Sequence, residues 1–155
     1  MTRSILQPDY LFLVVDFEAT CCDQGTIPSE EMEIIEIGAC WALADGAVID
    51  QFGCLVKPTL HPVLTPFCHN LLGIRQEDIE GAETITNAAL MLSTFVAQRS
   101  AHAVAWGSWG AFDSRQLDRE CLRVGIPNPI VKRPEFRGGS NPGEWSHEEV
   151  PEVFA

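Results

Sequence analysis

One apolar run near the amino terminus, LFLVVDFEATCC at residues 11–22, constrains the fold more than any other stretch. The unbroken apolar residues Leu11 to Val15 are typical of a buried β-strand. Two acids, Asp16 and Glu18, follow one residue apart. Because side chains two residues apart in a strand point to the same face, these carboxylates should stand side by side. Like charges repel at that spacing, so a core strand that carries both requires a compensating charge.

The composition indicates an acidic globular chain with one domain. It has 155 residues, of which 46% are hydrophobic and 21% charged. No apolar run approaches the ~20 residues of a membrane-spanning helix, and the opening MTRSILQPDY does not resemble a secretory signal. The net charge of −12 excludes a general attraction to a polyanion. If the chain binds nucleic acid, we expect it to do so locally, through metal ions and a few placed groups.

The six cysteines are best explained as reduced thiols of a cytoplasmic protein. The sequence contains no C-x-x-C pair, and several cysteines lie within apolar runs. A zinc site formed by Cys54, His61, Cys68 and His69 is the alternative. The spacing of these four residues matches no common zinc pattern, so we expect packed thiols instead.

The order of the predicted elements indicates an α/β fold. Strands are predicted at about 10–17, 31–43, 47–57 and 101–106, and helices at about 84–98 and 110–124. Asp45-Gly46 predicts a hairpin between the second and third strands. The helix over 84–98 followed by a strand favours a parallel crossover.

Three other segments complete the predicted organisation. Residues 1–9 form an amino-terminal tail, and residues 58–83 form an ordered loop with one or two short helical turns. The segment 127–155 is rich in proline and glycine, and we expect it to be extended or disordered. The domain itself is therefore predicted to span residues 10–126.

A third acid falls where a core residue is expected. In the predicted helix over 110–124, Asp113 lies four residues before Leu117, on the stripe that also carries Cys121 and Val124. A buried carboxylate without compensation costs several kcal/mol or becomes protonated. Mg²⁺ or Mn²⁺ removes this cost, since both ions prefer carboxylate oxygens and water. Two such ions about 4 Å apart can activate a water and stabilise the leaving oxygen of a phosphodiester.

A plainer interpretation treats each acid singly. Asp16 would cap a turn, Glu18 would be solvated, and Asp113 would occupy the first turn of its helix, where a negative charge is favoured. The three acids taken together favour the metal interpretation.

Four motifs in order resemble one family. They are VVDFEATC (14–21), EIIEIGACW (33–41), FGCLVKPTLHPVLTPFCHNLLGIRQEDIEGA (52–82) and GSWGAFD (107–113). They resemble the DEDDh 3′-to-5′ exonucleases, a DnaQ-like group, and most closely the Eri/KapD branch. The resemblance covers about residues 10–126 and implies a ribonuclease H-like mixed sheet with flanking helices, incomplete at its C-terminal part. It implies a metal-dependent exonuclease that acts on single-stranded RNA or DNA ends.

The resemblance also implies roles for individual residues. Asp16 would bridge two metal ions, Mg²⁺ or Mn²⁺, and Glu18 would bind the ion that activates the water. Asp113 would hold the second ion, through water.

Further residues are implicated in substrate binding by the same resemblance. The backbone around Ala19 and Thr20 would contact the 3′-terminal nucleotide. Trp109 would stack on the terminal base, since an aromatic face accepts any base. A core tryptophan is the alternative for Trp109.

The family's last motif, a histidine and an aspartate five residues later, has no trustworthy counterpart. After Asp113 the sequence has one further aspartate, Asp118 in the same predicted helix, and one further histidine, His147. Glu152 follows His147 at the family's spacing, but Pro151 between them opposes a helix.

We therefore expect an exonuclease domain impaired by truncation or a frameshift. Loss of the general base alone should cost ~10²–10⁴ in rate. Without the family's last helix, one face of the sheet should expose apolar surface. The alternative is a catalytically inactive nucleic-acid- or protein-binding module on the same fold.

Overall fold

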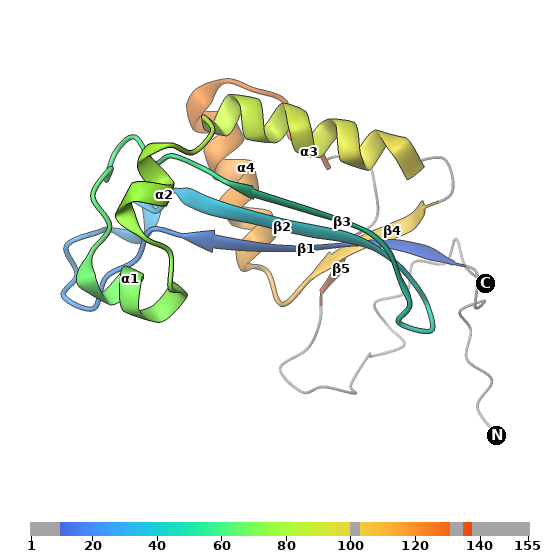
Figure 1. Ribbon diagram of the computed structural model, residues 1–155. Coiled ribbons are helices and arrows are strands. Elements are labelled where there is room, and N and C mark those ends of the chain that lie inside the picture. Colours follow the sequence, from blue (N-terminus) through green and yellow to red (C-terminus); the bar gives the residue numbers. More distant parts are fainter. Residues whose placement is uncertain (1–9, 100–102, 131–134, 138–155) are drawn as a thin grey trace.

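A five-stranded mixed sheet forms the centre of the fold, in the order β3-β2-β1-β4-β5 (Figure 1). The computed structural model describes residues 10–99, 103–130 and 135–137. Its elements are β1 (Leu11–Ala19), the 3₁₀ turn η1 (Ser29–Glu31), β2 (Ile34–Leu43), β3 (Val48–Leu55), α1 (Pro66–Leu72), α2 (Gln76–Glu80), α3 (Ile85–Arg99), β4 (Ala103–Ser108), α4 (Phe112–Val124) and β5 (Glu135–Arg137). This mixed sheet with flanking helices is the expected ribonuclease H-like architecture.

Strand β1 lies at the middle of the sheet and has a different type of neighbour on each side. It pairs antiparallel with β2 and parallel with β4. The β2–β3 hairpin confirms the Asp45-Gly46 turn, where Gly46 takes a positive φ of 92°. Strand β3 ends at Leu55, before the Pro58 that the sequence suggested as its limit.

The two faces of β1 have different environments, which corrects the prediction of a buried strand. Leu13, Val15 and Phe17 are buried in the core, whereas Val14 is 42% exposed and Asp16 is exposed. The strand is therefore buried on one face only, and the acids belong to the other face. Their proximity thus requires no charge inside the core.

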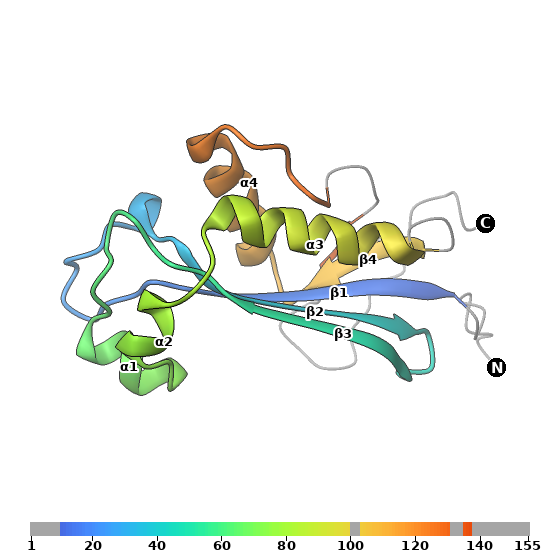
Figure 2. The same cartoon turned by 45° about the horizontal axis from the view of Figure 1, so that its top comes forward.

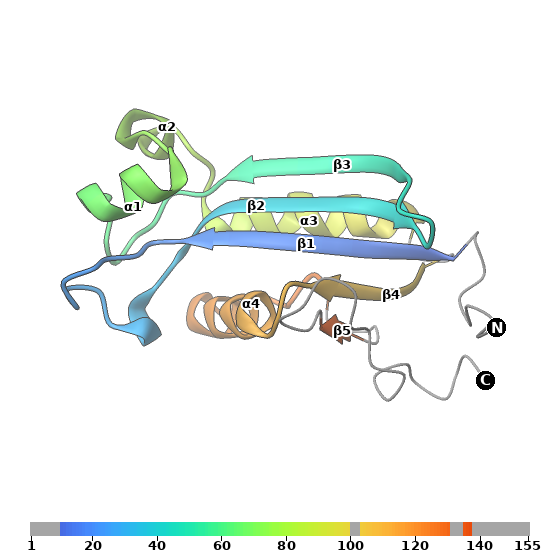
Figure 3. The same cartoon turned by 90° about the horizontal axis from the view of Figure 1, so that it is seen from below.

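Both long helices pack against the buried face of β1. Helix α3 contributes Ala88, Leu92 and Phe95 to the same core cluster as Leu117 and Cys121 of α4. Figure 2 shows α3 lying along the strands, and Figure 3 shows that no helix described by the structure covers the opposite face of β1, β2 and β3. The predicted exposure of apolar surface on this face stays a prediction, because residues 138–155 lie outside the described residues.

A second, smaller core fixes the segment between β3 and α3. Helices α1 and α2 lie beyond the ends of the long strands (Figure 1). The second cluster consists of Ile35, Leu64, Cys68, Ile74 and Ile79. The predicted loop with short helical turns is confirmed.

The ordered fold continues beyond residue 126. Ile130 is buried in the main core, and β5 pairs in parallel with β4. The proline- and glycine-rich composition of this region gave no strand period, so β5 was missed. His147, Pro151 and Glu152 lie outside the described residues. Within the described residues, no helix has the length and apolar character needed to cross a membrane.

Helix α4 ends at Gly125, which has a φ of 73° and donates its amide to the carbonyl of Cys121. A side chain in this left-handed region costs about 1–2 kcal/mol. Gly125→Ala should therefore lower the free energy of unfolding by about that amount, measured by urea denaturation. Gly53→Ala is the matched control: its φ is not positive, and at both positions a Cβ meets nothing within 4 Å. Equal stability losses in the two variants would contradict this assignment.

Candidate active site

The candidate site lies where strands β1 and β4 diverge. Their pairing ends at Val14 and Gly107, while β1 continues to Ala19. Beyond that point the first turn of α4 replaces β4 as the hydrogen-bonding partner of β1. The amide of Phe17 donates a hydrogen bond of 2.7 Å to Asp113 Oδ1. Carboxyl ends of parallel strands that diverge in this way are the usual ligand sites of open α/β sheets.

Asp113 is a buried acid with a structural partner. The residue is only 3% exposed. Its carboxylate accepts a hydrogen bond from the amide of Phe17, which lies beyond the part of β1 that pairs with β4. Burial raises the pKa of Asp113, the negative charge of Asp16 raises it further, and the hydrogen bonds from Phe17 and Ser108 offset part of this rise. The ionised carboxylate is therefore costly in this position unless a cation lies near it.

Asp16 and Glu18 stand on the uncovered face of β1. Asp16 is paired across the sheet with Gly38, and Glu18 with Glu36. A Cβ added to Gly38 would meet only the backbone oxygen of Asp16, at 3.4 Å. Gly38 itself therefore places no side chain beside Asp16, which is exposed.

Glu36 is a fourth acid that the sequence analysis did not assign to the site. Burial raises the pKa of the half-buried Glu18, and the charges of Asp16, Glu36 and Asp113 raise it further. Glu36 is paired with Glu18 of β1 and with Leu55 of β3. No cationic residue therefore lies directly opposite Glu36 on either neighbouring strand. The register could not be read from the sequence with enough accuracy to place Glu36 opposite Glu18.

The chemistry of these acids fits a hard divalent cation. All the donors are carboxylate oxygens, which Mg²⁺ and Mn²⁺ prefer. In the part of the chain that the structure describes, no three His, Cys, Asp or Glu side chains converge closely enough to hold an ion. Mg²⁺ normally retains several waters and uses substrate phosphates as ligands, so an open carboxylate set suits it.

Ala19 and Thr20 follow the acids directly and are both buried. The amide of Thr20 donates to the carbonyl of Glu33 at 2.8 Å, and its hydroxyl accepts from the amide of Glu33 at 3.0 Å. These two groups of Thr20 are therefore engaged within the protein.

Trp109 is 61% exposed at the end of β4, so the alternative of a core tryptophan is wrong. Phe112, one residue before Asp113, is 44% exposed and was missed by the sequence analysis. Its adjacency to Asp113 in the GAFD segment was the signal that could have identified it.

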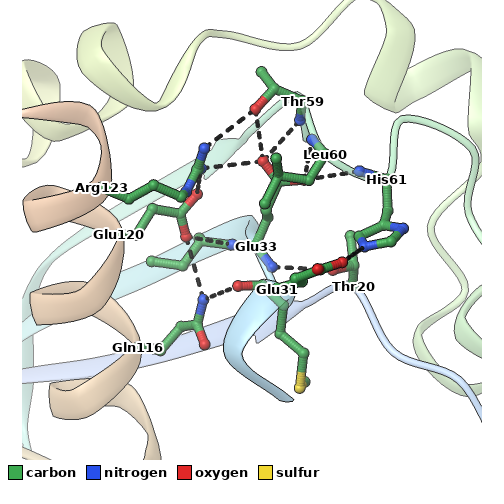
Figure 4. A network of polar contacts seen from close by, with 11 residues as sticks. Thr20, Glu31, Glu33, Thr59, Leu60, His61, Gln116, Glu120 and Arg123 are labelled. Atoms are coloured by element: carbon green, nitrogen blue, oxygen red, sulfur yellow. Dashed lines mark hydrogen bonds and ion pairs between the residues drawn. The ribbon is translucent and has the colours of Figure 1, made fainter. Parts of the chain in front are cut away.

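The inward face of α4 is largely polar (Figure 4). Gln116 Nε2 donates to the carbonyl of Met32 at 2.6 Å, and Glu120 Oε2 accepts from the amide of Ile34 at 2.7 Å. The guanidinium of Arg123 donates to both Glu120 and Glu33 at 3.1 Å. The predicted stripe of Leu117 and Cys121 is confirmed, but these polar partners were not predicted. They hold the helix that carries Asp113 against the start of β2.

The four residues of the zinc alternative have separate partners. His61 pairs with Glu31 at 2.8 Å, and the ring of His69 bonds the carbonyl of Ile74 at 2.8 Å. Cys54 and Cys68 donate to the backbone carbonyls of Leu55 and Ala19, respectively. Because each of the four residues is bonded to a different partner, the structure gives the zinc alternative no support. All six cysteines are free thiols.

Known proteins with similar sequences are exonucleases. The ERI1 exoribonuclease 2 of Homo sapiens is 38% identical over 142 residues, which cover 79% of this chain and 20% of that protein. The 3′-5′ exonuclease eri1 of Schizosaccharomyces pombe is 35% identical over 89 residues, covering 57% of this chain and 30% of the relative. The probable 3′-5′ exonuclease KapD of Bacillus subtilis is 28% identical, covering 76% of this chain and 56% of its own length. The chain thus spans a third or less of the two eukaryotic relatives.

The fold and a family model agree with these relatives. The nuclease domain of 3′hExo, a DEDDh family member bound to rAMP, superposes with a TM-score of 0.69 at 25% identity, covering 79% of this chain and 64% of that one. A family model described as Exonuclease (RNase_T) matches residues 13–132. The chain therefore belongs to this exonuclease family, within the Eri/KapD branch of the DEDDh 3′-to-5′ exonucleases.

Proposed function

We propose that this chain is a metal-dependent exonuclease domain that removes nucleotides from the 3′ end of single-stranded RNA or DNA. The observation that carries the proposal is the bond between Asp113 and the amide of Phe17. It brings an acid from α4 to the backbone between Asp16 and Glu18, so that carboxylates from two distant segments act on one another. Exonuclease relatives and the rAMP-bound structural neighbour support this function.

We assign Asp16, Glu18 and Asp113 as the residues that hold Mg²⁺ or Mn²⁺. Such ions, when bound, supply an activated water and stabilise the leaving oxygen of a phosphodiester. The chain itself positions the acids: β1 presents Asp16 and Glu18 on its open face, and Phe17 orients Asp113. Gly38, the residue paired with Asp16 on β2, has no side chain that could cover that acid.

The 3′-terminal nucleotide would lie against the backbone at Ala19 and Thr20, with its base on an exposed aromatic side chain. Trp109 and Phe112 flank the turn into α4 and are both exposed. Stacking on an aromatic face is tolerant of sequence, as an exonuclease requires. The net charge of −12 gives the chain no general affinity for nucleic acid, so binding should depend on the ions.

The general base is the part of the site that the described residues do not provide. His61 and His69 are the histidines with a described position, and both are engaged away from the acids. His102 and His147 lie outside the described residues. A site of this kind without a general base would turn over more slowly by ~10²–10⁴. This observation also favours the second candidate, a module that binds nucleic acid without cleaving it.

Two further assignments are part of this proposal. The exonuclease domain starts near residue 10 and extends past residue 126 to β5, because Ile130 belongs to the core and β5 to the sheet. A reducing compartment such as the cytoplasm suits the six free thiols.

Asp16→Ala should abolish stepwise shortening of a 5′-labelled single-stranded RNA in Mn²⁺, because Asp16 is the acid with the most direct access to the open face. Asp23→Ala, an exposed acid in the loop after β1, is the control and should retain the wild-type rate. Shortening that survives in Asp16→Ala would refute the assigned site. A wild-type chain that binds the RNA without shortening it would favour the second candidate.

Asp113→Asn should stabilise the metal-free protein at neutral pH. The raised pKa of Asp113 means that the folded state binds its proton more tightly than the unfolded chain, so stability falls as pH rises through that pKa. Asn removes the charge and keeps an oxygen to accept from Phe17. In EDTA at pH 7.5 the melting temperature of Asp113→Asn should exceed that of wild type, and the difference should shrink towards pH 4.

Mn²⁺ should reverse this order. Binding to the folded state raises the melting temperature of the wild-type protein, and Asp113→Asn should gain less because it has lost a ligand. A lower melting temperature of Asp113→Asn in EDTA at neutral pH would contradict the idea that the carboxylate is unfavourable without an ion.

A further inference from the structure

We propose that Glu33 is a positioning residue for the site, because it fixes Thr20, the loop at residues 59–61 and helix α4 relative to one another. This inference rests on the proposed function, in which Thr20 borders the 3′-terminal nucleotide. Glu33 touches none of the acids assigned to the metal site, so its effect would pass through the residues it holds.

Glu33 is only 1% exposed, and hydrogen-bond donors surround its carboxylate. It accepts the consecutive amides of Thr59, Leu60 and His61 at 2.8, 2.7 and 3.1 Å. The hydroxyl of Thr59 adds a bond of 2.8 Å, and Arg123 adds one of 3.1 Å (Figure 4). Burial alone would raise the pKa of Glu33, but the bonds from Thr59, His61 and Leu60 lower it. The side chain is therefore a buried carboxylate that stays ionised.

The backbone of Glu33 forms hydrogen bonds with the amide and the hydroxyl of Thr20. Its carbonyl accepts from the Thr20 amide at 2.8 Å, and its amide donates to the Thr20 hydroxyl at 3.0 Å. Thr20 immediately follows β1, which carries the acids. Any displacement of Glu33 is thus passed directly to the chain beside the site.

Helix α4 completes the arrangement from the other side. Arg123 bonds the carboxylates of Glu33 and Glu120, and Glu120 accepts the amide of Ile34, the residue after Glu33. The same helix carries Asp113 in its first turn. One buried side chain therefore connects the end of β1, the loop after β3 and the helix of the third acid.

Stability alone is a weak explanation for this cluster. A buried ion pair often adds no net stability over well-packed apolar side chains, because desolvation offsets the attraction. The contacts of Glu33 instead join the end of β1, the loop at residues 59–61 and the helix that carries Asp113, segments up to 90 residues apart in sequence. This favours a role in geometry.

Glu33→Gln tests the proposal. The substitution replaces one acceptor oxygen with an amide donor that must face the donors of residues 59–61 or Arg123. We expect KM for a single-stranded RNA to rise about tenfold with kcat changed much less, because Thr20 would border the bound 3′ end and a loss shared by ground and transition states appears in KM. If the wild-type chain binds without turnover, the dissociation constant in Mn²⁺ should rise by the same factor.

Trp41→Phe is the matched control for lost stability. Trp41 is fully buried, and its Nε1 donates to the carbonyl of Phe95 on α3 at 3.3 Å, away from Thr20. This variant should lower the melting temperature while leaving KM near the wild-type value. Equal KM values in Glu33→Gln and Trp41→Phe would overturn the proposal.

Amide hydrogen exchange separates this proposal from the proposed function. Without metal or substrate, Glu33→Gln should accelerate exchange at Thr20 as well as at residues 59–61, relative to Trp41→Phe. If wild type neither binds nor shortens RNA, the proposed function fails, and exchange at Thr20 still decides whether Glu33 holds it. Unchanged exchange at Thr20 would overturn the positioning role.

A milder variant covers the case in which Glu33→Gln does not fold. Thr59→Val removes one donor to the carboxylate, the hydroxyl bond of 2.8 Å, and leaves the charge in place. It should shift KM and Thr20 exchange in the same direction by a smaller factor. A folded Thr59→Val variant with wild-type values for both would count against the proposal.

Discussion

The hydrogen bond from the Phe17 amide to Asp113 is the contact on which the site depends. Strand β4 leaves β1 after Val14, and an edge amide of a central strand would otherwise lack a partner. An acid at the start of α4 satisfies this amide and is thereby fixed between Asp16 and Glu18. The divergence of the two strands thus leaves free the amide that places Asp113, the carboxylate proposed as a metal ligand.

The same helix is held to the sheet by polar contacts that extend well beyond its first turn. Gln116, Glu120 and Arg123 continue the inward face that Asp113 begins, and they bind the segment around Glu33. Hydrogen bonds have direction, whereas apolar contacts permit a helix to slide or rotate slightly. A helix docked by such bonds can keep Asp113, the proposed metal ligand, in a fixed position relative to β1.

Local signals in the sequence predicted most of the elements. The hairpin at Asp45-Gly46, the approximate ranges of α3 and α4 and the Leu117–Cys121 stripe of α4 were all expected, since turn chemistry and periodicity operate within a few residues. The exposure of the acids was not predicted, because the run from Leu11 to Val15 is apolar on both faces and only the packing of α3 and α4 reveals which face is covered.

The Glu33 network escaped prediction for a different reason. The contacts of Glu33 join residues 13 to 90 positions apart, and no local pattern distinguishes a buried glutamate from a solvated one at the start of a strand. Strand β5 was missed because its segment is short and lies between prolines and glycines. Long-range polar contacts and short edge strands are set by the tertiary fold.

The pairing of Glu18 with Glu36 across β1 and β2 would couple the binding of an ion to local order. Like charges placed directly opposite each other weaken a pair of strands, so this end of the β1–β2 pairing would be least stable when no cation is near. A cation bound there would offset the repulsion and stabilise the strand end, and a phosphate bound to the same cation would stabilise it further. Coupling between sites is reciprocal, so a change that stabilises the strand end also raises its affinity for the ion. The bound 3′ end of a nucleic acid would therefore help to order the surface that binds it.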